Sequence, residues 1–544
     1  RSLYRTTFAY YNVVIGESAM MAHKRGNYIT AVGSAVMQNT VSASNAVAIG
    51  GYAGQYVGHS KEASYTTMVG DLAGQYATGS SNTFIGYVAG KGGTTSAPYS
   101  SGQYNVADGT YAFDGFTTAG ETTAIGYNAG GSITTGIRNV TVGAYSGDSL
   151  TTGARNVAIG VHTLGAATTA NLNVAIGQGA MESAAASVAF EGAIAIGKDA
   201  LTALNSTDAN GTIAIGYQAG KAITSGRYST FVGYAAGYSS DTNDGNTFIG
   251  YLAGYEADAS TVVAGQNTYI GAFAGRFLDD GTDNVAIGYD AMASNSDSAA
   301  NAVNYSIAIG RNAMASSDSN QGTIAIGYYA GDHASADVDN AVIIGREAAR
   351  GAMTSGADGT VAIGYAASQA LTSGAGNLAI GYEALKVHTT GARNIAIGYG
   401  AMDDTDAGST SLGSTENIFI GKDSGGGTWA DAASNYNVAI GNNTMDAALN
   451  GALYNMAMGY GALGALTEGD SNLAIGHGAG TALTTGLGNI LLGRGAGDAM
   501  TTNSGVIAIG YSAASALNNN NGNYSVIIGY EAGQQKTSGN TDHL

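Results

Sequence analysis

The sequence predicts an all-β protein, an elongated β-solenoid (a β-roll) of about 29 coils with a base period of 17 residues. A five-residue phrase that ends in glycine recurs 29 times, from Gly16 to Gly529, and 15 of the 28 intervals between these anchor glycines are 17 residues long. Repetition at such a short fixed period is typical of units that bury their apolar surface only by stacking on their neighbours. Two runs keep the period without interruption, Gly109 to Gly177 and Gly459 to Gly510.

The phrase itself predicts one short β-strand per coil. In Asn156-Val157-Ala158-Ile159-Gly160, the residues one and three before the anchor glycine (positions −1 and −3) share one face of an extended chain, because side chains alternate. Position −1 is Ile, Val, Leu or Met in 28 of 29 repeats, and position −2 is most often Ala. Both faces of the strand are therefore apolar, and both should be covered.

The remainder of each coil has the composition of turns. Asn occupies position −4 in 16 of 29 repeats, where its amide can bond nearby backbone and stack into a ladder. A Tyr-x-Ala-Gly stretch such as Tyr127 to Gly130 follows the anchor, and Ile133 to Gly136 is expected to form a second short strand. Glycine suits the corners, where backbones turn sharply or approach closely.

A strand that is apolar on both faces also predicts self-association. One face can lie inside the coil, and the simplest cover for the other is a second copy of the chain, so we expect a parallel, in-register homotrimer with these strands near the shared axis and the Asn corners stacked along it. Coils stacked at about 4.8 Å would make a rod of roughly 140 Å.

Composition favours one continuous array over residues 1–544, with no second domain. Gly contributes 86 of 544 residues and Pro one, without the three-residue period of collagen, and 44% of residues are hydrophobic. The net charge of −19 and the absence of a basic stripe disfavour nucleic-acid binding. No apolar run is long enough to insert in a membrane, no signal peptide is visible, and the array lacks obvious caps. We therefore expect partners outside this chain that cap it: flanking domains, a chaperone domain or adjoining fibre subunits.

The combination of NVAIG, YxAG and (L/I)TTG resembles two families. It is seen nearly whole at Gly126 to Gly136 and at Gly381 to Gly398, and in altered form at Asn139 to Gly153. These residues resemble the β-roll head repeats of trimeric autotransporter adhesins and, more closely, the repeat shafts of phage tail-fibre proteins. The resemblance implies an extracellular homotrimer that attaches to a surface: a tail-fibre shaft or host-receptor attachment fibre on a virion, or alternatively a bacterial cell-surface adhesin or filament subunit. The implied partner is a cell-surface glycan or protein receptor.

The sequence shows no catalytic, cofactor-binding or metal-binding motif, so we expect no enzyme and no cofactor. The seven histidines are scattered without metal-ligand spacing. Acidic pairs at Asp279 and Asp280 and at Asp403 and Asp404 leave a calcium site open, although solvated loop charge is the simpler interpretation.

Three further features bear on surface function. Tyr follows the anchor in 13 of 29 repeats and forms either a glycan-stacking strip or a packing ladder. Thr pairs such as Thr134 and Thr135 leave an ice-binding solenoid as a minor alternative. Asp108 occupies the aliphatic position −1, so we expect it to be exposed on a distorted coil, because an unpaired buried carboxylate costs several kcal/mol.

Recognition is expected in the longest intervals, since extra chain in a solenoid forms outer loops. These intervals are Gly86 to Gly109, Gly250 to Gly271, Gly288 to Gly310 and Gly398 to Gly421. Neutral insertion is the equal alternative, because lengthening a loop costs little. The candidate receptor contacts are Tyr99, Tyr104, Asn295, Asp297, Asp403 and Asp404.

Overall fold

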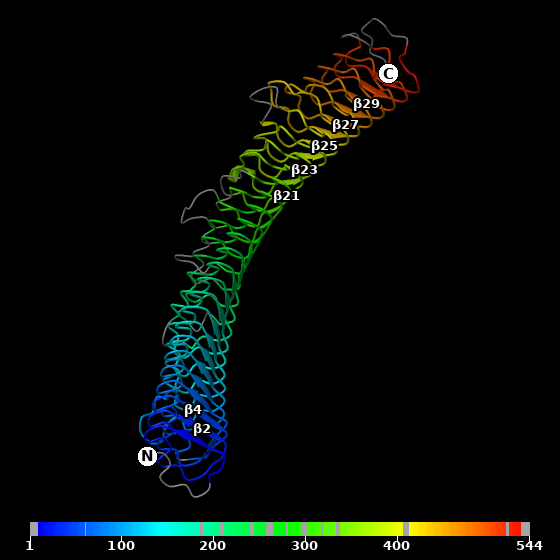
Figure 1. Ribbon diagram of the computed structural model, residues 1–544. Helices are drawn as coiled ribbons and strands as arrows, with labels where there is room; N and C mark the ends of the chain where they lie inside the picture. Colours follow the sequence, from blue (N-terminus) through cyan, green and yellow to red (C-terminus); the bar gives the residue numbers. More distant parts are fainter. Residues whose placement is uncertain are drawn as a thin grey trace. The chain divides into compact units, whose positions relative to one another are not determined.

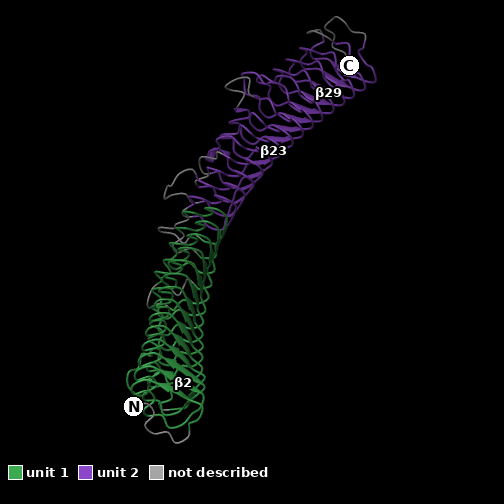
Figure 2. Ribbon diagram, viewed as in Figure 1, with its two compact units in different colours: residues 1–267 green, residues 268–544 purple. Residues whose placement is uncertain are grey.

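The computed structural model describes residues 9–59, 61–184, 189–206, 210–239, 244–256, 265–278, 281–294, 303–316, 319–332, 338–405, 413–517 and 522–534. The chain divides into two compact units, Arg1–Asn267 and Thr268–Leu544, which Figure 2 colours separately. Within each unit successive coils stack, and their short strands lie side by side in a parallel sheet (Figure 1). Each unit is therefore a parallel β-solenoid, as predicted.

Every strand of the first unit's main sheet ends just before an anchor glycine. The strands are Val13–Ile15 (β1), Ile29–Val32 (β2), Ala46–Ile49 (β4), Thr67–Val69 (β6), Thr83–Ile85 (β7), Val106–Asp108 (β8), Thr123–Ile125 (β9), Val140–Val142 (β10), Val157–Ile159 (β11), Val174–Ile176 (β12), Ile194–Ile196 (β13), Ile213–Ile215 (β14), Thr230–Val232 (β15) and Thr247–Ile249 (β16).

The second unit repeats this arrangement. Its strands are Thr268–Ile270 (β17), Val285–Ile287 (β18), Ile307–Ile309 (β19), Ile324–Ile326 (β20), Val342–Ile344 (β21), Val361–Ile363 (β22), Leu378–Ile380 (β23), Ile395–Ile397 (β24), Ile418–Ile420 (β25), Val438–Ile440 (β26), Met456–Met458 (β27), Leu473–Ile475 (β28), Ile490–Leu492 (β29), Ile507–Ile509 (β30) and Val526–Ile528 (β31). Among the described residues, the helical element with full bounds is the 3₁₀ turn Ser355–Ala357 (η2), and Gly413 also has 3₁₀ conformation.

The sheet keeps a strict register from coil to coil. Val157 of β11 pairs with Val174 of β12, and Ile159 pairs with Ile176. Equivalent positions therefore form continuous columns, so that one residue type repeated in the sequence becomes one stripe on the structure.

The structure decides which face of the strand lies inside. Ala158 and the residues at position −2 of every coil after the first are buried, whereas positions −1 and −3 point outward: Ile125 at −1 is 40% exposed and Val47 at −3 is 36% exposed. Each unit thus carries an apolar stripe on the outside of its sheet.

The sequence predicted that Asp108 is exposed and lies on a distorted coil. The predicted distortion is wrong. Asp108 pairs in register with Ile85 on one side and Ile125 on the other. It is exposed as expected, because position −1 faces outward in every coil, so an acid at this position requires no rearrangement.

The expected second strand is also wrong for most coils. Residues Ile133 to Gly136 form bends, and a short second pairing occurs between Ala43–Ser44 (β3) and Ala63–Ser64 (β5). Threonines hold these bends together instead. The Thr134 hydroxyl donates to the Thr151 carbonyl at 3.1 Å, and the Thr484 hydroxyl donates to the Thr501 carbonyl at 2.9 Å.

The Asn ladder is confirmed and lies inside the coil. The Asn156 side-chain amide donates to Asn139 Oδ1 at 3.1 Å and to the Ala170 carbonyl at 2.7 Å, and the Asn156 backbone N–H also donates to Asn139 Oδ1. All three interactions connect adjacent coils. A buried amide that satisfies several polar groups ties the stack together, since each group left unpaired would cost about 1–3 kcal/mol. The Asn column is covered by its own chain and needs no second copy.

The anchor glycine is required by close approach of successive coils. Gly160 has a φ of +139°, and a Cβ added to it would lie 2.7 Å from the carbonyl oxygen of Gly177 in the next coil. No other residue fits both the backbone conformation and the space.

Side chains elsewhere adopt left-handed backbone that sequence rules reserve for glycine. Positions −5, +2 and +4 repeatedly have φ near +55°, occupied for example by Tyr104, Asn128 and Leu164. Such residues are uncommon because each costs about 1–2 kcal/mol. The regular hydrogen bonds between coils must offset this cost, which explains why the turn is the same in every repeat.

Positions −2 and +4 share the core space by complementary size. Coils with Ala at −2 often have a large side chain at +4, as in Ala158 with Leu164, and coils with an aromatic residue at −2 have glycine at +4. A Cβ on Gly254 would lie 2.5 Å from the Phe248 ring. The core therefore stays filled while its residues vary.

Candidate functional site

The insertion between Gly86 and Gly109 packs part of its chain onto neighbouring coils. The Tyr99 ring lies 4.4 Å from that of Tyr56 and 6.2 Å from that of Tyr76, between ring centroids. Burial and the neighbouring Tyr56 raise the pKa of Tyr99. Tyr104 is instead 63% exposed at position −5, where its φ is +60°. These two candidate contacts thus differ, since only Tyr104 offers most of its ring to a partner.

The interval from Gly398 to Gly421 places its acidic pair against the coil. Burial, followed by the neighbouring Asp423 and Asp404, raises the pKa of Asp403 to about 6. Asp404 accepts a hydrogen bond from the Thr428 hydroxyl. Among the described residues, no group of three acidic, His or Cys side chains could hold a metal ion. Asn295, Asp297, Asp279 and Asp280 lie outside the described residues.

The tyrosines that follow the anchor glycines form stacked columns. Ring centroids of Tyr217, Tyr234 and Tyr251 are 5.0 and 5.2 Å apart, and those of Tyr365 and Tyr382 are 4.9 Å apart. Cations interrupt these columns and lie over the adjacent ring: Lys198 Nζ is 5.6 Å from the Tyr217 centroid. Such contacts contribute about 0.5–1 kcal/mol at exposed sites. Because the rings stack face to face, the column packs the coil corner and presents mainly ring edges to solvent.

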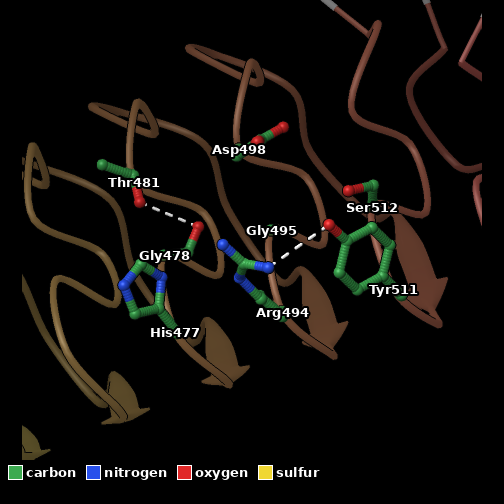
Figure 3. A pocket seen from close by; sticks show the side chains of 8 residues that line it. All are labelled: His477, Gly478, Thr481, Arg494, Gly495, Asp498, Tyr511 and Ser512. Atoms are coloured by element: carbon green, nitrogen blue, oxygen red, sulfur yellow. Dashed lines mark hydrogen bonds between the residues drawn. The ribbon is translucent and has the colours of Figure 1, made fainter.

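One part of this column borders a hollow of about 420 Å³ in the second unit. His477, Arg494 and Tyr511 occupy position +1 in three successive coils along one side (Figure 3). Thr481 and Asp498, both at position +5, lie along the other side. We call this hollow the three-coil groove. Its volume falls in the range of about 300–1,000 Å³ that small-ligand sites occupy.

The three-coil groove is hollow because two of its three coils lack a side chain at position +2, where the third coil carries Ser512. Gly478 and Gly495 form its floor, with φ values of +65° and +62°. Position +2 carries a side chain in most other coils, such as Asn128, Asn312 and Asn443, all with φ between 52° and 55°. The backbone is the same, so the glycines open a space without changing the turn.

Neighbouring interactions hold the groove walls in place. Arg494 Nη1 donates to the Tyr511 hydroxyl at 3.3 Å, and the guanidinium carbon lies 5.5 Å from the Tyr511 ring centroid. The Thr481 hydroxyl donates to the Gly478 carbonyl at 2.8 Å. The His477 ring stacks on that of Tyr460 with centroids 5.2 Å apart. Burial raises the pKa of Asp498, which lies partly under this surface.

Sequence reasoning did not identify the groove, because it considered each coil separately. The available signal was the spacing of Gly461, Gly478 and Gly495, which are 17 residues apart and hence stack. Aligning the coils would have shown the side chains missing at one column position.

Comparison with known proteins supplies no family for this chain: no protein-family model matches it, and no curated protein matches it significantly. Across the described residues, no helix is both long and apolar enough to cross a membrane.

Proposed function

We propose that this protein is a structural subunit of an extracellular attachment fibre, the shaft or receptor-attachment fibre of a phage tail, which assembles as a parallel homotrimer. The observation that carries the proposal is the apolar stripe formed by positions −1 and −3 on the outside of each sheet. Contiguous exposed apolar surface of this kind is characteristic of an interaction surface. Parallel sheets are nearly always covered on both faces.

A second copy of the same chain is the partner that fits the stripe best. The stripe repeats once per coil in strict register, so its partner needs an apolar surface with the same repeat along its length. The chain itself has that surface, and parallel copies would bring equivalent coils together. Symmetric homo-oligomers are the common outcome of such self-complementary surfaces.

Ice binding receives little support from the threonines. The Thr134 and Thr484 hydroxyls donate to carbonyls of the next coil, as do those of Thr151 and Thr372. These hydroxyls hold the stack together, which leaves the minor alternative of ice binding to the exposed second members of the pairs, such as Thr135.

Immunogold electron microscopy with antibodies raised against the purified chain tests the location. We expect label on the tails of phage particles from the source culture. Label on cell-surface filaments would replace the tail fibre by a bacterial adhesin or filament subunit. Label confined to the cell interior would overturn the fibre proposal altogether.

A further inference from the structure

The three-coil groove combines features that rarely coincide on this otherwise repetitive surface. Three successive position +1 side chains, two of them aromatic and one a cation, face two polar side chains at position +5 across a floor of glycine. His477, Arg494 and Thr481 are exposed, and Tyr511 is 40% exposed. These groove walls are therefore accessible to a ligand, and Figure 3 shows the side chains that line the groove.

The lining matches the chemistry of a sugar. A pyranose ring has an apolar face of C–H bonds, which packs against aromatic side chains. The Tyr511 ring stacks on that of Tyr530 and has the Arg494 guanidinium over it. The His477 ring stacks on that of Tyr460, so the sugar would meet mainly the edges of the Tyr511 and His477 rings. Its edge carries hydroxyl groups, which donate to a carboxylate such as Asp498 and accept from a guanidinium such as Arg494. Hydrogen bonds to charged partners are about twice as strong as those between neutral groups.

The spacing of the groove favours a chain of sugars over a single one. Coils stack about 4.8 Å apart, which is comparable to the length of one pyranose unit in an extended oligosaccharide. The lining residues come from three coils, so an oligosaccharide aligned with the stack would place one unit beside each coil.

The charges favour a neutral saccharide. One arginine and one aspartate line the groove, and their charges cancel formally. The whole chain carries a net charge of −19, which repels polyanions. An acidic sugar would be attracted by Arg494 and repelled by Asp498, so its charge would bring no net gain in affinity.

We propose that the three-coil groove, lined by His477, Arg494, Tyr511, Thr481 and Asp498, is a binding site for a neutral oligosaccharide. The inference rests on the proposed function, because an attachment fibre needs a surface ligand, and it names the class of that ligand. It places recognition on regular coils instead of the insertions.

The sharpest variant fills the groove with a residue that other coils already carry there. In the coil that begins at Gly441, the Asn443 amide donates to Asp446 Oδ2 at 2.9 Å and so bridges positions +2 and +5. The double substitution Gly478→Asn and Gly495→Asn should close the groove in the same way. Asn at position +2 has φ near +53° elsewhere, close to the values of the two glycines, so the coil should stay folded.

The test uses an array of neutral hexose and N-acetylhexosamine oligosaccharides, from one to six units, with sialylated and uronic-acid oligosaccharides alongside. Calorimetric titration of the full chain with the strongest neutral binder then gives its affinity. We expect affinity to rise with length up to three units. The double variant Gly478→Asn with Gly495→Asn should weaken binding at least tenfold. Asp498→Ala, made in the chain that keeps both glycines, should weaken binding by a similar factor.

Tyr234→Ala is the matched control, because Tyr234 belongs to a stacked column that borders filled positions +2 at Gln218, Ala235 and Leu252. Its binding should stay within twofold of the parent chain. The proposal is overturned if no neutral oligosaccharide binds, if only acidic ones bind, or if the filled variant keeps its circular dichroism spectrum and binds as well as the parent. The immunogold experiment tests the fibre proposal independently. Labelled tails without sugar binding would therefore support the attachment fibre and overturn the oligosaccharide site in the groove.

Discussion

The two uninterrupted 17-residue runs share one scaffold and differ in the surface that it displays. In both runs buried Asn side chains connect successive coils: Asn156 bonds Asn139 in the first, and Asn472 bonds Asn455 in the second. The aromatic column differs. In the first run it combines Tyr111, Tyr145 and His162 at position +2 with Tyr127 at position +1.

In the second run position +2 is glycine in three coils, at Gly461, Gly478 and Gly495, and the column stands at position +1, beside an open groove. One repeated backbone therefore supports either a closed or a hollow surface, depending on one column. Because the hydrogen bonds that define the coil lie in the interior, the outer positions can change without loss of the fold.

The largest expected effect concerns core size, which individual coils of the two runs satisfy in different ways. One coil of the first run pairs Ala158 with Leu164, and one coil of the second pairs Leu491 with Gly497, whose Cβ would lie 2.9 Å from Leu491. Leu491→Ala should lower the free energy of unfolding by about 2–5 kcal/mol. Adding Gly497→Leu should restore most of the lost free energy of unfolding, because the double variant reproduces the pairing of Ala158 with Leu164. Urea unfolding measures both, and a double variant no more stable than the single one would refute size complementarity.

A second test concerns position +7, where both runs carry aliphatic side chains such as Leu150 and Leu483, whereas the coil that begins at Gly381 carries His388. Burial lowers the pKa of His388 to about 4 from its ordinary 6.5. Below pH 6.5 the unfolded chain takes up this proton and the folded chain does not. Stability should therefore fall by about 3 kcal/mol between pH 6.5 and 4.

His388→Leu isolates that contribution, because it introduces the residue type found in both runs. Unfolding as a function of pH should show a shallower acid loss in this variant. An unchanged slope would mean that other groups account for the acid sensitivity.

The shared Asn ladder predicts equal damage in the two runs. Asn156→Ala and Asn472→Ala each remove an acceptor and a donor that link three coils. We expect each to cost about 2 kcal/mol locally, from the polar groups left unpaired. Native-state hydrogen exchange of the flanking coils measures this cost. A loss in only one run would show that the two scaffolds are not equivalent.

The smallest effect concerns the acids at position +5, where Asp148, Asp498 and Asp403 share a raised pKa caused first by burial. Asp403 is the strongest case, with a pKa of about 6. Its protonated form is favoured in the fold, so its contribution is present below pH 3.8 and is lost as pH rises through 6. Asp403→Asn should stabilise the chain by about 1 kcal/mol at pH 7, after discounting for partial exposure. Thermal unfolding at pH 7 and pH 4 checks the sign, and a destabilised variant at pH 7 would contradict it.

The strands and their register could be predicted because they depend on a local pattern of alternating side chains before each anchor. The choice of inner face could not, because Ala158 and Ile159 are both apolar and only packing shows that the smaller one lies inside. Because the inner face was unknown, the sequence also predicted a distorted coil at Asp108, although position −1 faces outward. Left-handed backbone at Tyr104 or Leu164 contradicts local propensity and follows from contacts between coils. The groove depends on residues that are neighbours only after stacking, so no single segment encodes it.

The outer stripe of positions −1 and −3 is common to both runs, and its burial between copies is the central claim. Light scattering coupled to size-exclusion chromatography measures it directly. The parent chain of 54.1 kDa should elute at three times that mass, about 162 kDa, and Ile287→Asp, which places a charge on the stripe, should shift it toward 54.1 kDa. A folded, monodisperse parent chain at 54.1 kDa would contradict the claim.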